Sequence, residues 1–182
     1  MDPEAVLHCT LRQGTVYKLL NRNIPSPKPH YQIVLNIRPL DSHDLHVAVV
    51  TSQVEDLKAL LNRPGVDPST IVFIDPSEYH PPLYLDSGVD CNRVRLLRKE
   101  ELLERWNERE TDHGLPDCPN ALLDRIKKGV LISDKVEDEI KAAILDCPVG
   151  DVPTRVRSCF GALADRCYPN VENPNVDDGV SV

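Results

Sequence analysis

The order of hydrophobic and polar positions predicts several short strands in the first part of the chain. The strongest pattern is a mostly apolar run at residues 45–51, which leads into the polar residues Ser52 and Gln53. Such a run, bounded by turn residues, is typical of a strand that is buried on both faces. Thr51 and Ser52 then lie where the strand leaves the core. Their hydroxyls either face a cleft or cap the next helix, since Glu55 and Asp56 follow.

Other segments complete the pattern on both sides of this run. Alternating or β-branched residues predict strands at 14–20, 31–37 and 70–74, and a strand pair or bent strand at 89–97. Apolar stripes predict helices at 54–62 and 99–106. Proline-rich segments at 24–30 and 75–82 and a turn at 86–88 separate these elements. Residues 1–13 are expected to form a loosely attached lead-in.

The C-terminal part is predicted to be helical. A polar linker at 107–118 precedes helical patterns at 119–130 and 134–145 and a third helix at 155–167. Ser133, followed by Asp134 and Glu137, is predicted to cap the second helix. The apolar stripes of the first two helices need a partner, which is either the barrel of the same chain or a second copy. Because acidic helices would be attracted to a basic RNA groove, we expect residues 119–147 to dock on the protein's own dimer and shield that groove. Residues 168–182 are predicted to form a disordered acidic tail.

Charge and cysteine content narrow the functional classes. The net charge is −8, and residues 1–106 carry 12 Lys and Arg against 14 Asp and Glu, whereas residues 107–182 carry 9 against 15. This balance argues against broad, nonspecific nucleic-acid binding but leaves room for a local basic groove in the first part. No apolar run approaches the length of a membrane span, and the acidic start lacks the pattern of a secretory signal, so we expect a cytoplasmic protein with no membrane partner.

Metal binding is not expected. The six cysteines form no CxxC pair and are interpreted as free thiols. His43, Asp44 and His46 cluster like metal ligands, but they span a turn and lack a further anchor. Asp86 and Ser87 are interpreted as turn formers.

Several short motifs, in their order, resemble the MazF/PemK family of toxin ribonucleases from bacterial toxin–antitoxin pairs. The motifs are Gly14-Thr15-Val16-Tyr17, the proline-containing approach to the second strand, Thr51-Ser52-Gln53, Asp86-Ser87 and Cys91-Asn92-Arg93-Val94-Arg95. The resemblance covers roughly residues 11–106. It implies an α+β, mainly β fold in which residues 14–106 form a small SH3-like barrel, with a helical C-terminal extension at 119–167.

The resemblance also implies an activity. Such proteins are homodimers, are paired with a cognate antitoxin, and cut single-stranded RNA without a metal or cofactor by attack of the 2′-hydroxyl on the neighbouring phosphate. This chemistry requires proton transfer and donors for the charge that develops on phosphate. Thr51 matches the family's residue after the third strand.

The sequence departs from the family before the second strand. The family places an Arg there, where this chain has Lys28-Pro29-His30, and the family's Glu is also absent. Histidine exchanges protons near neutral pH, so His30 is a candidate for proton transfer, with a turn or edge-strand histidine as the alternative. Lys28 is either a phosphate clamp or a solvated loop lysine.

The remaining candidates are predicted to bind RNA. They are Ser52, Gln53, Arg93 and Arg95. Arg93 and Arg95 lie two residues apart and would share one face of a strand, where they would follow a phosphate backbone or form surface ion pairs. The sequence therefore predicts a metal-independent endoribonuclease. The alternative is a non-catalytic binding module that kept the fold and lost the catalytic Arg.

Overall fold

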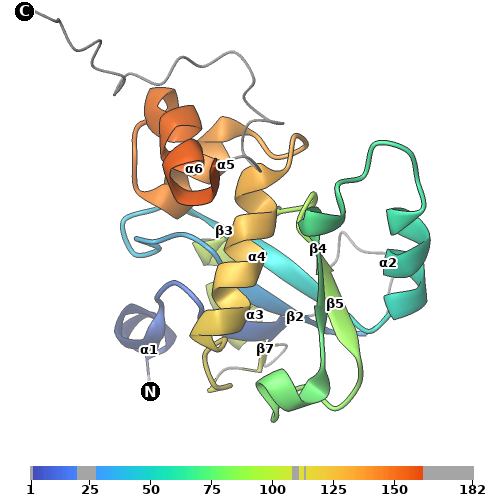
Figure 1. Cartoon of the computed structure of the whole chain (residues 1–182). Coiled ribbons are helices and arrows are strands. Elements are labelled where there is room, and N and C mark those ends of the chain that lie inside the picture. Colours follow the sequence, from blue (N-terminus) through green and yellow to red (C-terminus); the bar gives the residue numbers. More distant parts are fainter. Residues whose placement is uncertain (1, 20–27, 108–110, 113, 162–182) are drawn as a thin grey trace, which may run out of the picture.

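A computed structural model describes residues 2–19, 28–107, 111–112 and 114–161 (Figure 1). The predicted tail at 168–182, the end of the third C-terminal helix and residues 24–27 of the proline-rich loop lie outside this part. The strands are β1 (Val16–Leu19), β2 (His30–Val34), β3 (Asp44–Thr51), β4 (Ile71–Ile74), β5 (Ser87–Asp90), β6 (Arg95–Arg98) and β7 (Thr111–Asp112). The α-helices are α1 (Pro3–Thr10), α2 (Val54–Leu61), α3 (Lys99–Asn107), α4 (Asn120–Ile132), α5 (Asp138–Leu145) and α6 (Val152–Phe160).

The strands form one antiparallel sheet with the order β4-β5-β3-β2-β1-β7, and β6 also pairs with β3. The α+β class is therefore confirmed. The pairings among the described strands leave β4 and β7 at the two ends of an open sheet, so the predicted closure into an SH3-like barrel is not seen among them. None of the described helices has the length and apolar character that a membrane crossing needs.

The central strand is β3, as the apolar run predicts. It pairs with β2 along one edge and with β5 and β6 along the other. Ala48 and Val50 point into one core cluster, and Leu45 and Val47 point into a second cluster on the opposite face. The strand is thus buried on both faces in its middle, whereas Asp44 and His46 near its start and Val49 and Thr51 near its end are only partly buried.

Helices cover both faces of the sheet. The predicted stripe of α4 is buried with the sheet residues of the first cluster, and it comprises Leu122, Leu123, Ile126 and Val130. The C-terminal helices thus pack on the sheet of their own chain, which is one of the two partners that the sequence left open. Ser133 does not begin α5, because it is buried and directly follows α4.

The opposite face is covered by α1 and α3. Leu7 of α1 and Leu102 of α3 pack with Tyr17 and Leu19 of β1 in the second cluster. Residues 3–10 are therefore an integral helix, where the sequence suggested a loose lead-in. The segment predicted as a linker also contains β7, which pairs with β1.

Residues 86–88 do not form the predicted turn, because Ser87 and Gly88 belong to β5. Gly88 lies where α2 crosses this strand. A Cβ at position 88 would lie 2.5 Å from Leu57 Cδ1 and 2.9 Å from the Val72 carbonyl oxygen. Only glycine lets α2 approach β5 this closely.

Candidate functional site

The sheet face that carries α1 and α3 continues, beyond these helices, to the C-terminal end of β3. Tyr31 pairs with Val50, and the same register continued by one residue places His30 opposite Thr51. Directly opposed residues of antiparallel strands point to the same face, with Cβ atoms about 4.5–5.5 Å apart. Strand register therefore brings the predicted proton-transfer residue beside the predicted phosphate-holding residue.

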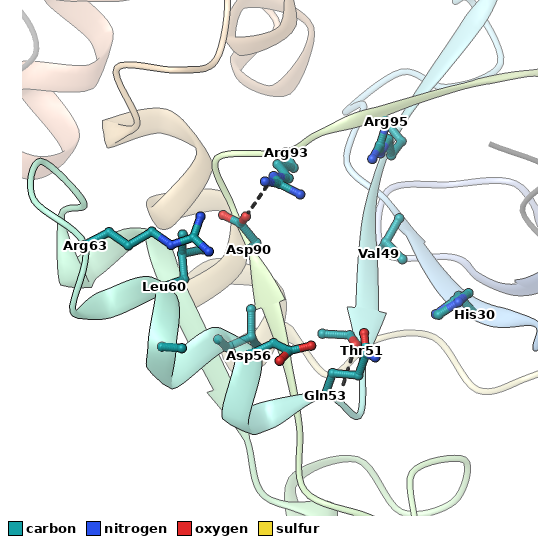
Figure 2. Close-up of a pocket in the computed structure, with 12 residues that line it drawn as sticks. His30, Val49, Thr51, Gln53, Asp56, Leu60, Arg63, Asp90, Arg93 and Arg95 are labelled. Carbon is teal, nitrogen blue, oxygen red and sulfur yellow. Dashed lines mark hydrogen bonds and ion pairs between the residues drawn. The ribbon is translucent and has the colours of Figure 1, made fainter. Parts of the chain in front are cut away.

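Two adjoining grooves meet at this pair. The first, which we call the arginine groove, holds about 440 Å³ between α2 and the sheet (Figure 2). Its lining residues are His30, Val49, Thr51, Gln53, Asp56, Leu57, Ala59, Leu60, Arg63, Asp90, Arg93 and Arg95. The second, which we call the tyrosine groove, holds about 330 Å³ and is lined by Lys28, Pro29, His30, Tyr31, Val50, Thr51, Ser52, Gln53, Pro82, Leu83, Tyr84, Leu85 and Ser87.

All seven residues singled out in the sequence line these grooves. His30, Thr51 and Gln53 line both, Arg93 and Arg95 line the first, and the second adds Lys28 and Ser52. Every lining residue lies between positions 28 and 95. No described residue of the C-terminal helices lines either groove, so the predicted shielding is not seen within one chain.

Thr51 does not cap α2. The helix begins after Gln53, which makes no side-chain capping bond. Instead, Thr51 Oγ1 accepts a hydrogen bond of 3.1 Å from the backbone N–H of Gln53, as the dashed line in Figure 2 marks. This bond orients the Thr51 hydroxyl and uses it only as an acceptor, so its O–H can still donate to a ligand in either groove.

His30 carries a buried nitrogen atom that is not satisfied. Its Nε2 is buried and has no hydrogen-bond partner among the described residues. Such an atom costs about 1–3 kcal/mol relative to a paired one, and buried polar atoms without partners call for a functional or ligand-based explanation.

The arginine groove is a local basic surface of the kind that the charge distribution of residues 1–106 allows. Three arginines face two carboxylates there, and Arg93 Nε lies 3.3 Å from Asp90 Oδ2. Arg95 and Arg63 form no ion pair within the described part of the chain. Sequence reasoning missed Arg63, because a basic residue just after a helix is ordinarily explained by the helix dipole alone.

The sequence suggested that Arg93 and Arg95 share one face of a strand. They do not, because β6 begins only at Arg95. Val50 pairs with Val89 and Val47 pairs with Arg95, so three steps along β3 correspond to six along the facing segment. Residues 91–94 therefore bulge out of the sheet, with three more residues than the facing strand. Bulges of this kind redirect side chains next to functional sites, and this one turns Arg93 into the groove.

The bulge is fixed from behind by hydrogen bonds. Asn92 Nδ2 donates to Thr70 Oγ1 at 2.8 Å and to Asp90 Oδ1 at 3.0 Å. Ser133 Oγ, at the end of α4, donates to Asn92 Oδ1 at 2.7 Å. The acceptor and both donors of the Asn92 side chain are thereby used, which holds Asp90 and Arg93 in place.

Among the described residues, no group of three or more His, Cys, Asp or Glu side chains is gathered to hold a metal ion. His43 Nδ1 lies 3.8 Å from Glu100 Oε1, and His46 lies partly buried on β3, where burial lowers its pKa. The described cysteines are free, and burial raises the pKa of both Cys91 and Cys118 to about 12, so neither is a nucleophile at neutral pH.

No family model matches the sequence, and no protein of curated function matches it. Among solved structures, the fold is similar to a chain described as an endoribonuclease in complex with its cognate antitoxin from a Mycobacterial species. The two are 15% identical, with a TM-score of 0.41 over 76% of this chain and 96% of that chain. A likeness at this level establishes neither a family nor a function.

Proposed function

We propose that this protein is a metal-independent endoribonuclease that cuts single-stranded RNA by attack of a 2′-hydroxyl on the adjacent phosphate. The observation that supports this proposal is the convergence of His30 and Thr51 at the junction of the two grooves. A histidine side chain and a hydroxyl with an available hydrogen are the groups that this transfer requires.

In the proposed reaction, the His30 imidazole accepts the proton of the 2′-hydroxyl as the bond between the 2′-oxygen and phosphorus forms. The bond from phosphorus to the 5′-oxygen breaks, and the leaving oxygen takes a proton from a water molecule. The protonated His30 then gives its proton to the hydroxide that remains, which restores both the water and the neutral histidine. The products are a 2′,3′-cyclic phosphate and a 5′-hydroxyl. Thr51 donates a hydrogen bond to the phosphate oxygen that gains charge, and Lys28 holds the same phosphate from the tyrosine groove.

The flanking nucleotides occupy the rest of the grooves. Arg93 and Arg95 contact phosphates on one side of the cut, and Ser52 and Gln53 donate to the strand as it crosses between the grooves. From the family resemblance we further propose that the protein acts in the cytoplasm as a homodimer and is held inactive by a cognate antitoxin.

A non-catalytic binding module is the second candidate. Two features favour it: Lys28-Pro29-His30 stands where the family has Arg, and Asp56 and Asp90 reduce the positive charge of the arginine groove. Such a module would bind RNA or a protein segment in the same grooves and leave it intact.

Cleavage of a defined RNA in excess EDTA separates these functions. We expect the full-length protein to cut a single-stranded oligonucleotide into products that end in a 2′,3′-cyclic phosphate. A single 2′-deoxy substitution at the cut site should stop cleavage there, because the attacking hydroxyl is missing. Binding without cleavage would favour the module, and cleavage that EDTA abolishes would contradict the proposed mechanism.

A further inference from the structure

The wall of the tyrosine groove carries an unusual apolar surface. Tyr84 and Leu85 are consecutive and expose 70% and 67% of their surface, more than any other large hydrophobic residue of the described chain. Pro29, Pro82 and Leu83 add further apolar groups to the lining of this groove. Isolated exposed apolar residues are common, but an adjacent aromatic and aliphatic pair at the mouth of a groove indicates a binding surface.

This pair is held in place by its neighbours. The Tyr31 hydroxyl donates to the Pro82 carbonyl at 3.2 Å, and Ser87 Oγ donates to the Leu85 carbonyl at 2.9 Å. Leu83 between them is buried. The segment is thus anchored on both sides of Tyr84 and Leu85, and the exposed side chains are presented on a fixed backbone.

The orientation of the Tyr84 ring leaves it open to a ligand. His80 meets it edge to face, with ring centroids 4.9 Å apart and an interplanar angle of 83°. An edge-to-face contact covers at most one face of a ring, and the exposure of Tyr84 shows that the rest is open to solvent. A fixed, exposed aromatic ring is the element on which single-stranded nucleic acids stack their bases.

We propose that Tyr84 and Leu85 form a nucleobase platform, on which the base beside the cleaved phosphate stacks. This inference rests on the proposed ribonuclease function and adds a division of labour to it. The arginine groove takes phosphates, the tyrosine groove takes a base, and His30 and Thr51 act at the junction that both grooves share. The platform contributes affinity with little sequence preference, since every base has a stacking face.

Binding of an uncleavable oligonucleotide tests the platform. The probe is a single-stranded RNA with one 2′-deoxy nucleotide at the cut site, titrated into the full-length protein. Loss of one base stack is expected to weaken binding about tenfold, so Tyr84→Ala should raise Kd by that factor. Tyr84→Phe should bind like the wild type, because it keeps the ring and loses only the hydroxyl. Leu96→Ala is the matched control, since Leu96 is also exposed but lines neither groove.

A second probe, in which the nucleotide beside the cut site is abasic, identifies the occupant. It should bind wild-type protein about tenfold more weakly than the intact probe, and Tyr84→Ala should add little to that loss. Cleavage and binding that are unaffected by Tyr84→Ala would overturn the platform and leave the ribonuclease intact. A Tyr84→Ala effect of equal size on intact and abasic probes would also overturn it, because the ring would then contact something other than the base. Absence of any RNA binding by the wild type would overturn both proposals.

Discussion

At the scale of residues, the site depends on whether its basic side chains already have a partner within the protein. His30 faces Thr51 across β2 and β3, Arg93 is paired with Asp90, and Arg95 has no ion-pair partner among the described residues. An unpaired arginine in a groove is available to phosphate, whereas a paired one first has to give up its carboxylate. Loss of the Arg95 side chain should therefore weaken RNA binding directly.

Arg95→Ala should weaken RNA binding and reduce its dependence on salt. Each phosphate contact with single-stranded nucleic acid contributes about 0.7 to the slope of log K against log salt, so the slope should fall by roughly that amount. Arg98→Ala is the matched control, because Arg98 lies on β6 and is exposed, but it points to the other side of the strand and lines neither groove. Equal slopes for Arg95→Ala and the wild type would remove Arg95 from the site.

At the scale of elements, the bulge between β5 and β6 links the C-terminal helices to the grooves. Ser133 holds Asn92 by a hydrogen bond, and Gly129 lets α4 lie directly on the bulge. A Cβ at position 129 would lie 2.8 Å from Cys91 Sγ and 3.1 Å from the Ser69 carbonyl oxygen. The contact leaves no room for a methyl group, so a displacement of α4 would also displace the bulge.

Gly129→Ala should lower the free energy of unfolding by about 1–3 kcal/mol, the usual range for overpacking a core contact. It should also lower RNA cleavage, because the displaced bulge carries Arg93. Gly150→Ala is the control, as a Cβ there would meet nothing within 4 Å. Chemical denaturation measures the first effect and initial cleavage rates measure the second. Unchanged stability of Gly129→Ala would show that α4 does not restrain the bulge.

Ser133→Ala probes the same restraint without adding volume. It leaves Asn92 Oδ1 and the Lys135 N–H without the hydroxyl they share, at a cost of about 1–3 kcal/mol. Ser133→Thr, which keeps the hydroxyl, should restore cleavage more than stability. A kcat equal to that of the wild type in Ser133→Ala would confine Ser133 to a structural role.

The sequence was sufficient for elements with strong periodicity and insufficient where distant segments decide the structure. The run at 45–51 and the stripe of α4 were predicted because burial leaves a regular pattern. Ser87 and Gly88 were assigned to a turn because their composition is turn-like, but pairing with β3 and β4 places them in a strand. Ser133 has the local sequence of a helix cap, and its partner Asn92 is 41 positions away.

The same distinction applies to the site. Thr51, His30 and Lys28 were predicted from the places that they occupy in the motifs of the family resemblance, and pairing of β2 with β3 brings His30 beside Thr51. Arg63 and Tyr84 were not predicted, since neither belongs to a local pattern with a chemical meaning. Their place becomes evident only when α2 and the segment after β4 close around the end of β3.

At the scale of the whole molecule, the described chain has one sheet and a core on each face. The first core cannot form without α4, which contributes five buried aliphatic side chains to it: Leu122, Leu123, Ile126, Val130 and Leu131. Each is worth about 1.5–3 kcal/mol of burial, against a total stability of about 5–15 kcal/mol for a typical domain. The C-terminal part is therefore required for the sheet that carries the grooves.

A chain that ends at Trp106 should consequently aggregate or lose its cooperative thermal transition. The control ends at Cys167 and removes only the segment that the sequence predicts to be disordered, so its Tm should stay within about 2 °C of the wild type. Circular dichroism and size-exclusion chromatography distinguish the two outcomes. A soluble, folded and fully active chain ending at Trp106 would show that the sheet forms without the helices.

The most direct test of a catalytic centre at His30 and Thr51 is a double-mutant cycle on RNA cleavage in excess EDTA. It compares Thr51→Ala, His30→Ala and the double variant in the full-length chain. If the two residues act at one phosphate, each single variant should lose on the order of a hundredfold or more in kcat. The double variant should lose little more than the worse single one, because groups that act as a unit are not additive. Wild-type cleavage by both single variants would contradict the central claim that the His30–Thr51 pair is the catalytic centre.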